Sequence, residues 1–201
     1  MKSIEEFKKE DLYGREARLL YEWEKIDEYC QRSKDVSYLV RKTTPKGLPV
    51  LYEVEYRIRS FSGVKDSDEQ GQQTPELDDK FLMNIYIPNN YPNIDSKLEF
   101  KFALKDINGK KIPHPWHPNI RYFGDFAGRV CLTTNLYGSY TDLAWYIRRV
   151  KQYLKYEAYH PDEDKPPFPE DLKVAQWVRE QGEKYIKELQ EYHKKQNKEI
   201  S

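Results

Sequence analysis

The stretch Ile112–Leu132, IPHPWHPNIRYFGDFAGRVCL, decides the fold assignment of this chain. Prolines fix φ and remove backbone donors, so we expect an extended, ordered loop here and neither a helix nor a central strand. The prolines are Pro113, Pro115 and Pro118. Gly124 and Gly128 allow sharp turns before Cys131. A cysteine on a braced loop suits a nucleophile; a buried, unreactive cysteine is the alternative, and the loop alone favours neither.

Length and composition favour one domain over 1–201, with a core from about Leu12 to Gln190 between charged termini. Lys plus Arg and Asp plus Glu are balanced at 34 each, which gives no support for a nucleic-acid or anionic-membrane binder. No apolar run approaches the roughly 18 residues that span a bilayer, and the charged N-terminus lacks a secretory signal. Two distant cysteines, Cys30 and Cys131, predict no disulfide, so we expect a cytoplasmic protein with free thiols.

Hydrophobic periodicity predicts an α+β fold in which an antiparallel meander packs on helices. A first helix is expected from about Leu12 to Cys30, with Glu22 among its outward charges. Its apolar stripe consists of Leu19, Trp23, Ile26 and Cys30. Alternating apolar residues predict strands over 50–61, 81–87 and 98–104. The polar residues 62–79 are expected to form one long mobile loop.

Two helices are expected after the Cys131 loop. The first runs from Asp142 to Ala158 with Thr141 as N-cap. Its buried stripe consists of Leu143, Ile147, Val150 and Leu154. A Pro-rich break follows, and a final helix starts near Pro169-Glu170-Asp171, where proline and acidic residues suit a helix N-terminus. The apolar positions of that helix include Leu172, Ala175, Val178, Ile186 and Leu189.

This order of parts resembles the ubiquitin-conjugating enzyme family over roughly Leu12 to Gln190. Four local motifs carry the resemblance: a Tyr-Pro turn after the second strand, a His-Pro-Asn tripeptide, a Gly-x-x-Cys-Leu step and an acidic, Pro-flanked loop. They are Tyr91-Pro92, His117-Pro118-Asn119, Gly128–Leu132 and Pro161–Pro166. Each motif is weak alone, and their order makes the resemblance specific.

The resemblance implies that Cys131 accepts the C-terminal glycine of a ubiquitin-like modifier from an activating enzyme as a thioester. The modifier then passes to an amine of a protein target, usually a lysine, and a hydroxyl acceptor stays open. No metal or other cofactor is implied, because the thioester is already activated and a thiol is nucleophilic at an ordinary pKa. Whether a ligase takes part is left open.

The resemblance also implies roles for residues around the cysteine. Asn119 braces the loop, donates to the oxyanion, or does both, and His117 with Pro118 supports the loop. Asp162 and Asp164 lie where the family often places a residue that orients or deprotonates the incoming lysine. At the position that is commonly acidic, either of these aspartates or Lys165 is aligned.

Several features depart from the family pattern. Cys131 follows Asn119 by twelve positions, more than is common, and the extra segment either covers the thioester or simply packs. Its aromatic residues are Tyr122, Phe123 and Phe126. The apolar residue and Pro pair that ligases commonly grip are missing after Tyr91-Pro92, and the first helix is acidic. The chain is therefore similar to the divergent conjugating enzymes of bacterial operons, for which antiphage defence is one setting, and a dedicated activating enzyme and modifier are implied.

Three other functions are considered. A non-catalytic variant would bind a modifier as a scaffold, although such relatives usually lack the cysteine. A cysteine hydrolase would pair Cys131 with His117 or His160, but no third orienting residue is evident. A zinc site formed by His114, His117, Cys131 and His160 is the weakest hypothesis, because the spacing matches no structural zinc pattern.

Overall fold

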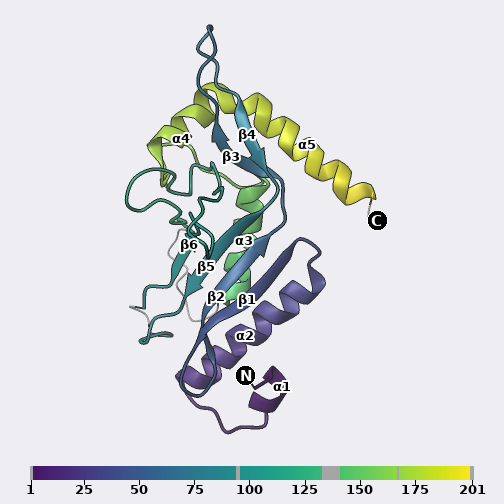
Figure 1. Ribbon diagram of the computed structural model, residues 1–201, viewed down its shortest axis with the longest axis vertical. Helices are drawn as coiled ribbons and strands as arrows, with labels where there is room; N and C mark the ends of the chain where they lie inside the picture. Colours follow the sequence, from purple (N-terminus) through teal and green to yellow (C-terminus); the bar gives the residue numbers. More distant parts are fainter. Residues whose placement is uncertain (1, 94–95, 133–140, 167, 200–201) are drawn as a thin grey trace.

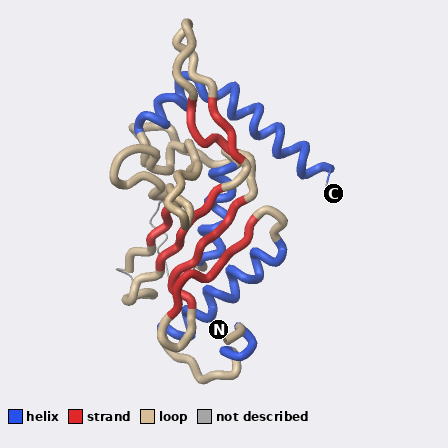
Figure 2. Tube along the Cα trace, in the orientation of Figure 1, coloured by secondary structure: helices blue, strands red, loops and turns tan. Residues whose placement is uncertain are grey.

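A four-stranded antiparallel sheet in the order β1-β2-β5-β6 forms the centre of the molecule (Figures 1 and 2). The computed structural model describes all residues except 1, 94–95, 133–140, 167 and 200–201. The strands are β1 (Val36–Thr43), β2 (Pro49–Tyr56), β5 (Phe81–Tyr86) and β6 (Glu99–Phe102). The predicted antiparallel α+β arrangement is confirmed. The edge strand β1 was not predicted, because most of its residues are partly exposed and its apolar alternation is short.

One face of the sheet is buried under two helices, α2 (Arg15–Arg32) and α3 (Leu143–Leu154) (Figure 1). The predicted alternation is confirmed, because every second residue of β2 and β5 is buried in this core. These residues are Tyr52, Val54, Tyr56, Phe81, Met83 and Ile85. The Tyr56 hydroxyl also donates to the Ile147 carbonyl at 3.3 Å, which joins the sheet to α3. Burial of this apolar face is the main stabilising contribution to the fold.

The stripe of α2 is confirmed, since Leu19, Trp23 and Ile26 are buried and Cys30 packs against them. A short helix that was not predicted, α1 (Ile4–Phe7), precedes α2 and begins at a capping box of Ser3 and Glu6. The outward orientation expected for Glu22 is wrong, because its side chain is 0% exposed. Hydrogen bonds from Arg18, Tyr91 and Leu143 compensate for the burial of the Glu22 carboxylate, and the last two residues are distant in sequence.

A second, two-stranded sheet rises from the end of the first. Its strands β3 (Ser60–Val64) and β4 (Pro75–Asp78) pair as an antiparallel hairpin. The prediction of a single loop over 62–79 is therefore wrong. The hairpin is polar on its own and depends on Phe61, which packs with Trp177 and Tyr156 at ring-centroid distances of 5.8 and 5.0 Å. Because its apolar partners lie about a hundred residues later, a local pattern does not indicate these strands.

The C-terminal region covers the hairpin with α4 (Leu172–Trp177), a π-helical segment η1 (Val178–Gly182) and α5 (Glu183–Glu199) (Figure 1). The predicted single helix is thus interrupted, and the π-helical turn shifts the buried face. Val174 and Trp177 are buried, whereas Leu172 is 55% exposed, against the prediction.

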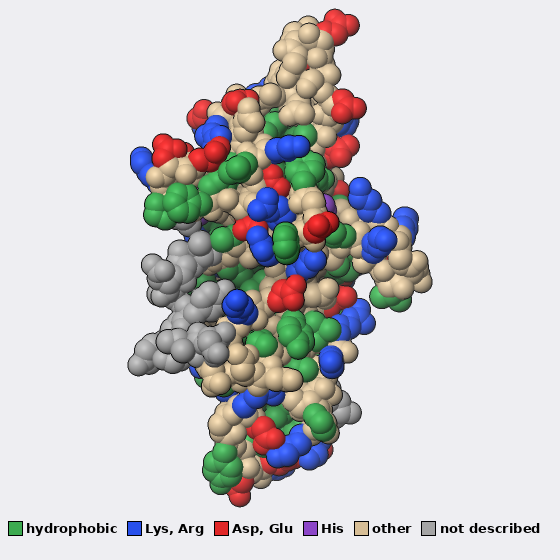
Figure 3. Space-filling view, turned by 90° about the vertical axis from the view of Figure 1, so that its left-hand side faces the viewer, with side chains coloured by type: hydrophobic (Ala, Val, Ile, Leu, Met, Phe, Trp, Pro, Cys, Tyr) green, Lys and Arg blue, Asp and Glu red, His purple; other side chains and the backbone are tan. Residues whose placement is uncertain are grey.

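The buried stripe predicted for α3 is confirmed, because all four of its apolar residues lie in the core. The helix ends earlier than expected, at Leu154. Its N-cap is Asp142 and not Thr141, since the Asp142 carboxylate accepts from the Trp145 N–H at 2.7 Å. Among the described helices, none is both long and apolar enough to cross a membrane. The face shown in Figure 3 mixes Lys and Arg with Asp and Glu side chains, as the balanced composition suggests.

Candidate active site around Cys131

Asn119 and Cys131 lie opposite each other in a short antiparallel pairing. Ile120 pairs with Val130, and the Cys131 N–H donates to the Asn119 carbonyl at 2.9 Å. Residues directly opposite in such a pairing project from the same face, with Cβ atoms about 4.5–5.5 Å apart. The twelve-position separation in sequence therefore becomes side-by-side placement in space.

The extra segment between these two residues forms the turn of that pairing. The Arg121 N–H donates to the Arg129 carbonyl at 2.8 Å, and the Gly128 N–H donates back to Arg121 at 2.7 Å. Gly124 and Gly128 have φ values of +77° and +87°, in line with the predicted sharp turns. A Cβ at Gly128 would lie 2.4 Å from the Phe102 carbonyl oxygen, so this position requires glycine. The added residues form the turn that connects the two paired segments, so Asn119 and Cys131 lie opposite each other despite the long separation in sequence.

Cys131 is partly exposed and has no disulfide partner. Its neighbours Val130 and Leu132 are buried and anchor the segment on the core. The Tyr153 hydroxyl of α3 donates to the Cys131 carbonyl at 3.2 Å. Both backbone polar groups of the cysteine are thus fixed while its side chain is not sealed in the core.

Asn119 is completely buried and only half bonded. Its Oδ1 accepts from the His160 N–H at 3.0 Å, so the amide orientation is set by the loop that follows α3. Its Nδ2 has no hydrogen-bond partner within the described part of the chain. A buried donor without an acceptor costs stability. Asn119 lies opposite Cys131 in the backbone pairing, and donation by this amide to a substrate oxygen is a prediction.

His117 braces the loop in its neutral form. Its Nδ1 accepts from the Asn119 N–H at 3.1 Å, so the proton lies on Nε2, which is 3.1 Å from the Ala158 carbonyl. The ring also stacks on Tyr153 at 4.7 Å. Burial lowers the pKa of His117 to about 3. With both nitrogens engaged by the backbone, this ring has neither a free lone pair for a metal nor the basicity for proton abstraction.

The remaining predicted site residues differ in their placement. The Pro118 carbonyl accepts from the backbone N–H groups of Glu170 and Asp171 at 2.7 and 3.0 Å. Asp162 and Asp164 are exposed on the loop after α3, and within the described residues no hydrogen bond or ion pair joins either to Asn119 or Cys131. The carboxylates are therefore free to approach a substrate amine from solvent, which remains a prediction.

His160 lies closer to the site, since its backbone holds Asn119. Its ring is partly exposed, and its Nε2 lies 3.5 Å from the Arg149 guanidinium. Burial, together with the Arg149 charge, lowers the pKa of His160. The ring is therefore neutral at physiological pH.

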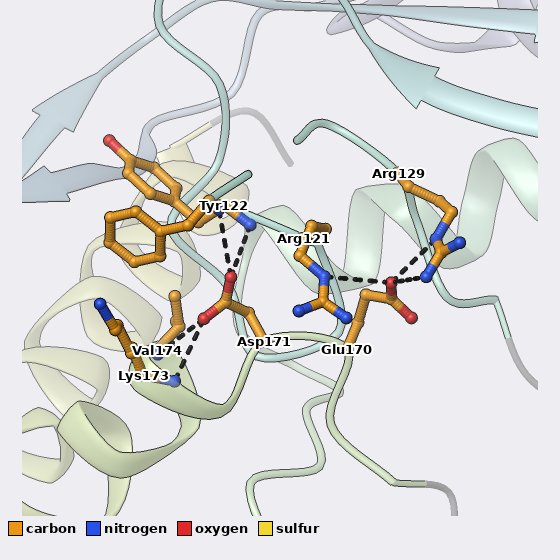
Figure 4. A network of polar contacts seen from close by, with 8 residues as sticks. Arg121, Tyr122, Arg129, Glu170, Asp171, Lys173 and Val174 are labelled. Carbon is orange, nitrogen blue, oxygen red and sulfur yellow. Dashed lines mark hydrogen bonds and ion pairs between the residues drawn. The ribbon is translucent and has the colours of Figure 1, made fainter. Parts of the chain in front are cut away.

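Glu170 and Asp171, which were predicted only as acidic residues at a helix N-terminus, hold the turn in place (Figure 4). The buried Asp171 carboxylate accepts from the backbone N–H groups of Tyr122 and Phe123 through Oδ2, at 2.9 and 3.2 Å, and caps α4 through Oδ1. Glu170 pairs with Arg129 at 2.5 Å and with Arg121 at 3.4 Å. The acidic pair before an apolar run indicated the helix cap, but no sequence signal indicated the contact with the turn.

The three aromatic residues of the turn have different surroundings. Tyr122 stacks on His114 at 4.3 Å and donates its hydroxyl proton to the Ser62 carbonyl at 2.7 Å, so it packs between the loop and the hairpin. Phe123 contacts Trp116 edge to face at 5.8 Å. Phe126 is 60% exposed, and the Arg129 guanidinium lies over its ring. Phe123, which is 43% exposed, and Phe126 are left to cover a bound acyl group, and this role stays a prediction.

The structure does not bring metal ligands together. Within the described residues, no group of three or more His, Cys, Asp and Glu side chains is placed to hold a metal ion. His114, one of the four residues considered for zinc, directs its Nε2 to the Tyr122 carbonyl at 3.2 Å. Tyr140, which stands near a tryptophan position of the family, lies outside the described residues.

Comparisons with known proteins bear on the fold. No family model matches the sequence, and no curated protein sequence matches it. A Plasmodium yoelii protein assigned as a ubiquitin-conjugating enzyme superposes with a TM-score of 0.51 at 18% identity, over 92% of this chain and 97% of that one. The H. polymorpha ubiquitin-conjugating enzyme Pex4p, solved with the soluble domain of Pex22p, gives 0.50 at 17% identity, over 90% and 96%. At this identity the likeness concerns the fold, and the chain has the fold of the ubiquitin-conjugating enzymes.

Proposed function

We propose that this protein is a ubiquitin-like-protein conjugating enzyme that carries its modifier on Cys131. The observation that carries the proposal is the backbone pairing of Cys131 with Asn119: the Cys131 side chain is partly exposed, and the buried Asn119 Nδ2 lacks a partner among the described residues. A fold shared with ubiquitin-conjugating enzymes supports the same reaction but does not by itself imply activity.

The proposed reaction requires the protein mainly to position the reacting groups. The Cys131 thiolate attacks the thioester carbonyl that joins the modifier's C-terminal glycine to an activating enzyme, and the activating enzyme's thiolate leaves. An amine of the target then attacks the new thioester, loses a proton, and displaces the Cys131 thiolate. Each attack places negative charge on the carbonyl oxygen, and in this proposal the Asn119 Nδ2–H donates to that oxygen.

The surrounding residues serve this geometry. His117 and Pro118 hold the loop through backbone contacts on both sides of the site. Asp162 and Asp164 are exposed carboxylates that orient the incoming amine or accept its proton. The partners are a ubiquitin-like modifier, its activating enzyme and a protein target, in a cytoplasm that keeps the thiols reduced.

The two cysteines provide an internal control. Burial raises the pKa of the Cys30 thiol to about 12, so this thiol is not a nucleophile near neutral pH. Incubation with the cognate activating enzyme, modifier and ATP is expected to give a thiol-sensitive adduct on a non-reducing gel. Cys131→Ala should abolish that adduct, and Cys30→Ala should retain it. An adduct that survives Cys131→Ala, or none with the unaltered protein, contradicts the proposal.

The alternative functions give different results in the same assay. A scaffold would bind the modifier in a calorimeter without forming an adduct. A hydrolase would release the modifier from a substrate without any activating enzyme. Because His117 is neutral and engaged at both ring nitrogens, the geometry gives the hydrolase no base at that position.

A further inference from the structure

A hollow of about 480 Å³ lies on a part of the molecule that the proposed reaction does not use. It is bounded by the C-terminal end of α2, the bend between β2 and β3, the end of α3, and α5. Six of its described lining residues are cationic and one is acidic, Asp35. The cations are Arg32, Lys34, Arg57, Arg59, Lys151 and Lys155. Since the whole chain has no net charge, this is a local concentration of positive charge.

Carboxylates pair with three of these six cations. The lining acid Asp35 is bound by Lys151 at 2.5 Å. Arg57 and Arg59 reach outward to acids that do not line the hollow, Glu55 at 2.7 Å and Asp79 at 3.1 Å. Among the described residues, no ion pair joins the other three lining cations, Arg32, Lys34 and Lys155, to an acid.

Lys155 is the most informative of these residues. It is 8% exposed, yet its ammonium group has no hydrogen bond or ion pair to any side chain or carbonyl that the structure describes. The aliphatic stem of a lysine can be buried while its ammonium group stays in water. Because Lys155 lines the hollow, an anion that enters from solvent can reach this ammonium group.

We propose that this hollow binds a small anion that carries several phosphate groups. Its volume lies within the range of small-molecule sites, about 300–1,000 Å³. The cations come from three parts of the chain: the end of α2 with the turn after it, the bend between β2 and β3, and the end of α3. They surround a concave surface, which fits a compact, multiply charged ligand better than a nucleic-acid duplex. Ser33, Gln196 and His193 add polar groups to the lining. Nucleotides, inorganic polyphosphates and phosphorylated sugars share the chemistry that this site recognises.

Titration calorimetry with sodium tripolyphosphate at low ionic strength tests the proposal on the full chain. We expect saturable binding of one equivalent that weakens as salt is added. Lys155→Gln and Lys34→Gln should each raise the Kd about tenfold or more, as loss of a charge-assisted contact does. Lys34 is exposed, so its variant should fold even where the buried Lys155 variant does not. The matched control Lys187→Gln removes a charge from the exposed surface of α5 and should leave the Kd unchanged.

The proposal is overturned by the absence of saturable tripolyphosphate binding, or by equal weakening in Lys187→Gln. It is also overturned where a polyglutamate peptide binds and tripolyphosphate does not compete. ATP and inositol hexakisphosphate, titrated in the same way, separate the sources: tighter binding than tripolyphosphate by one of them assigns the ligand class. Because binding is measured without the activating enzyme, failure here leaves the conjugation proposal untouched.

Discussion

Glu22 and Asn119 are both completely buried polar residues, and they differ in how far their polar atoms are bonded. Both Glu22 oxygens have partners, whereas the Asn119 Nδ2 has none within the described residues. A fully bonded buried group stabilises a fold, and a half-bonded one weakens it. The difference leads us to expect that loss of Glu22 affects mainly stability, whereas loss of Asn119 affects mainly the proposed reaction.

Glu22 joins three distant parts of the chain. Its Oε1 accepts from the Arg18 guanidinium at 2.6 Å and from the Tyr91 hydroxyl at 2.5 Å. Its Oε2 accepts from the Leu143 N–H, the first residue of α3, at 2.6 Å. Burial raises the pKa of this carboxyl while these contacts favour its charged form. One side chain thereby links α2, the Tyr91-Pro92 turn and the start of α3.

The largest expected effect is on Glu22→Ala, which should lower the free energy of unfolding by about 3–5 kcal/mol, because removal of one member of a buried ion pair leaves the others without partners. Urea unfolding monitored by tryptophan fluorescence measures this loss. The control Glu28→Ala removes an exposed partner of Lys25 and should leave the free energy of unfolding nearly unchanged, because solvent screens such a pair. Equal losses in the two variants would show that the buried network carries no special weight.

Asn119→Ala should lower the rate of modifier transfer by about 10²–10³-fold, the usual cost of losing one oxyanion donor. Asn119→Asp keeps an acceptor for the His160 N–H but loses the Nδ2 donor, so it separates bracing from donation. If the donor matters, single-turnover rates fall in both variants; if only the brace matters, Asn119→Asp keeps its rate. Unfolding measurements should show a far smaller loss than for Glu22→Ala, and a similar loss would remove the contrast between the two residues.

The sequence pattern predicts the buried faces of the helices and strands, but it does not predict the surroundings of Glu22 or the placement of Asn119 beside Cys131. The stripe of α2 and the alternation of β2 and β5 follow from neighbours in sequence, so they are predictable. Glu22 is not, since its burial depends on partners at Tyr91 and Leu143. Likewise the motif resemblance singles out Asn119 and Cys131, but their placement side by side follows from the backbone register of the turn, to which no residue pattern points.

Asp171 is a third buried polar residue, and both of its carboxylate oxygens accept hydrogen bonds, as those of Glu22 do. It accepts four backbone N–H groups, two from the turn and two from α4. Asp171→Ala should therefore cost about 2–3 kcal/mol of unfolding free energy through the lost cap and charge-assisted hydrogen bonds. The turn should also exchange its amide hydrogens faster than β2 and β5 do. Unchanged protection at Tyr122 and Phe123 would mean that Asp171 does not hold the turn.

His117 extends the comparison to the effect of pH. Its Nδ1 accepts from the Asn119 N–H only while the ring is neutral. Its pKa is about 3 in the folded protein against 6.5 ordinarily. Between these values the unfolded chain binds a proton that the folded chain does not, so stability is complete above about pH 6.5 and falls as pH drops towards about 3. The slope for this one group is at most about 1.4 kcal/mol per pH unit. His117→Gln should show a shallower slope from pH 6.5 to 4.5 in urea unfolding, while His114 and His193, whose pKa values burial also lowers, contribute equally to both proteins. An identical slope would mean that the ring does not resist protonation, and the brace beside Asn119 would then be weaker than its two backbone contacts imply.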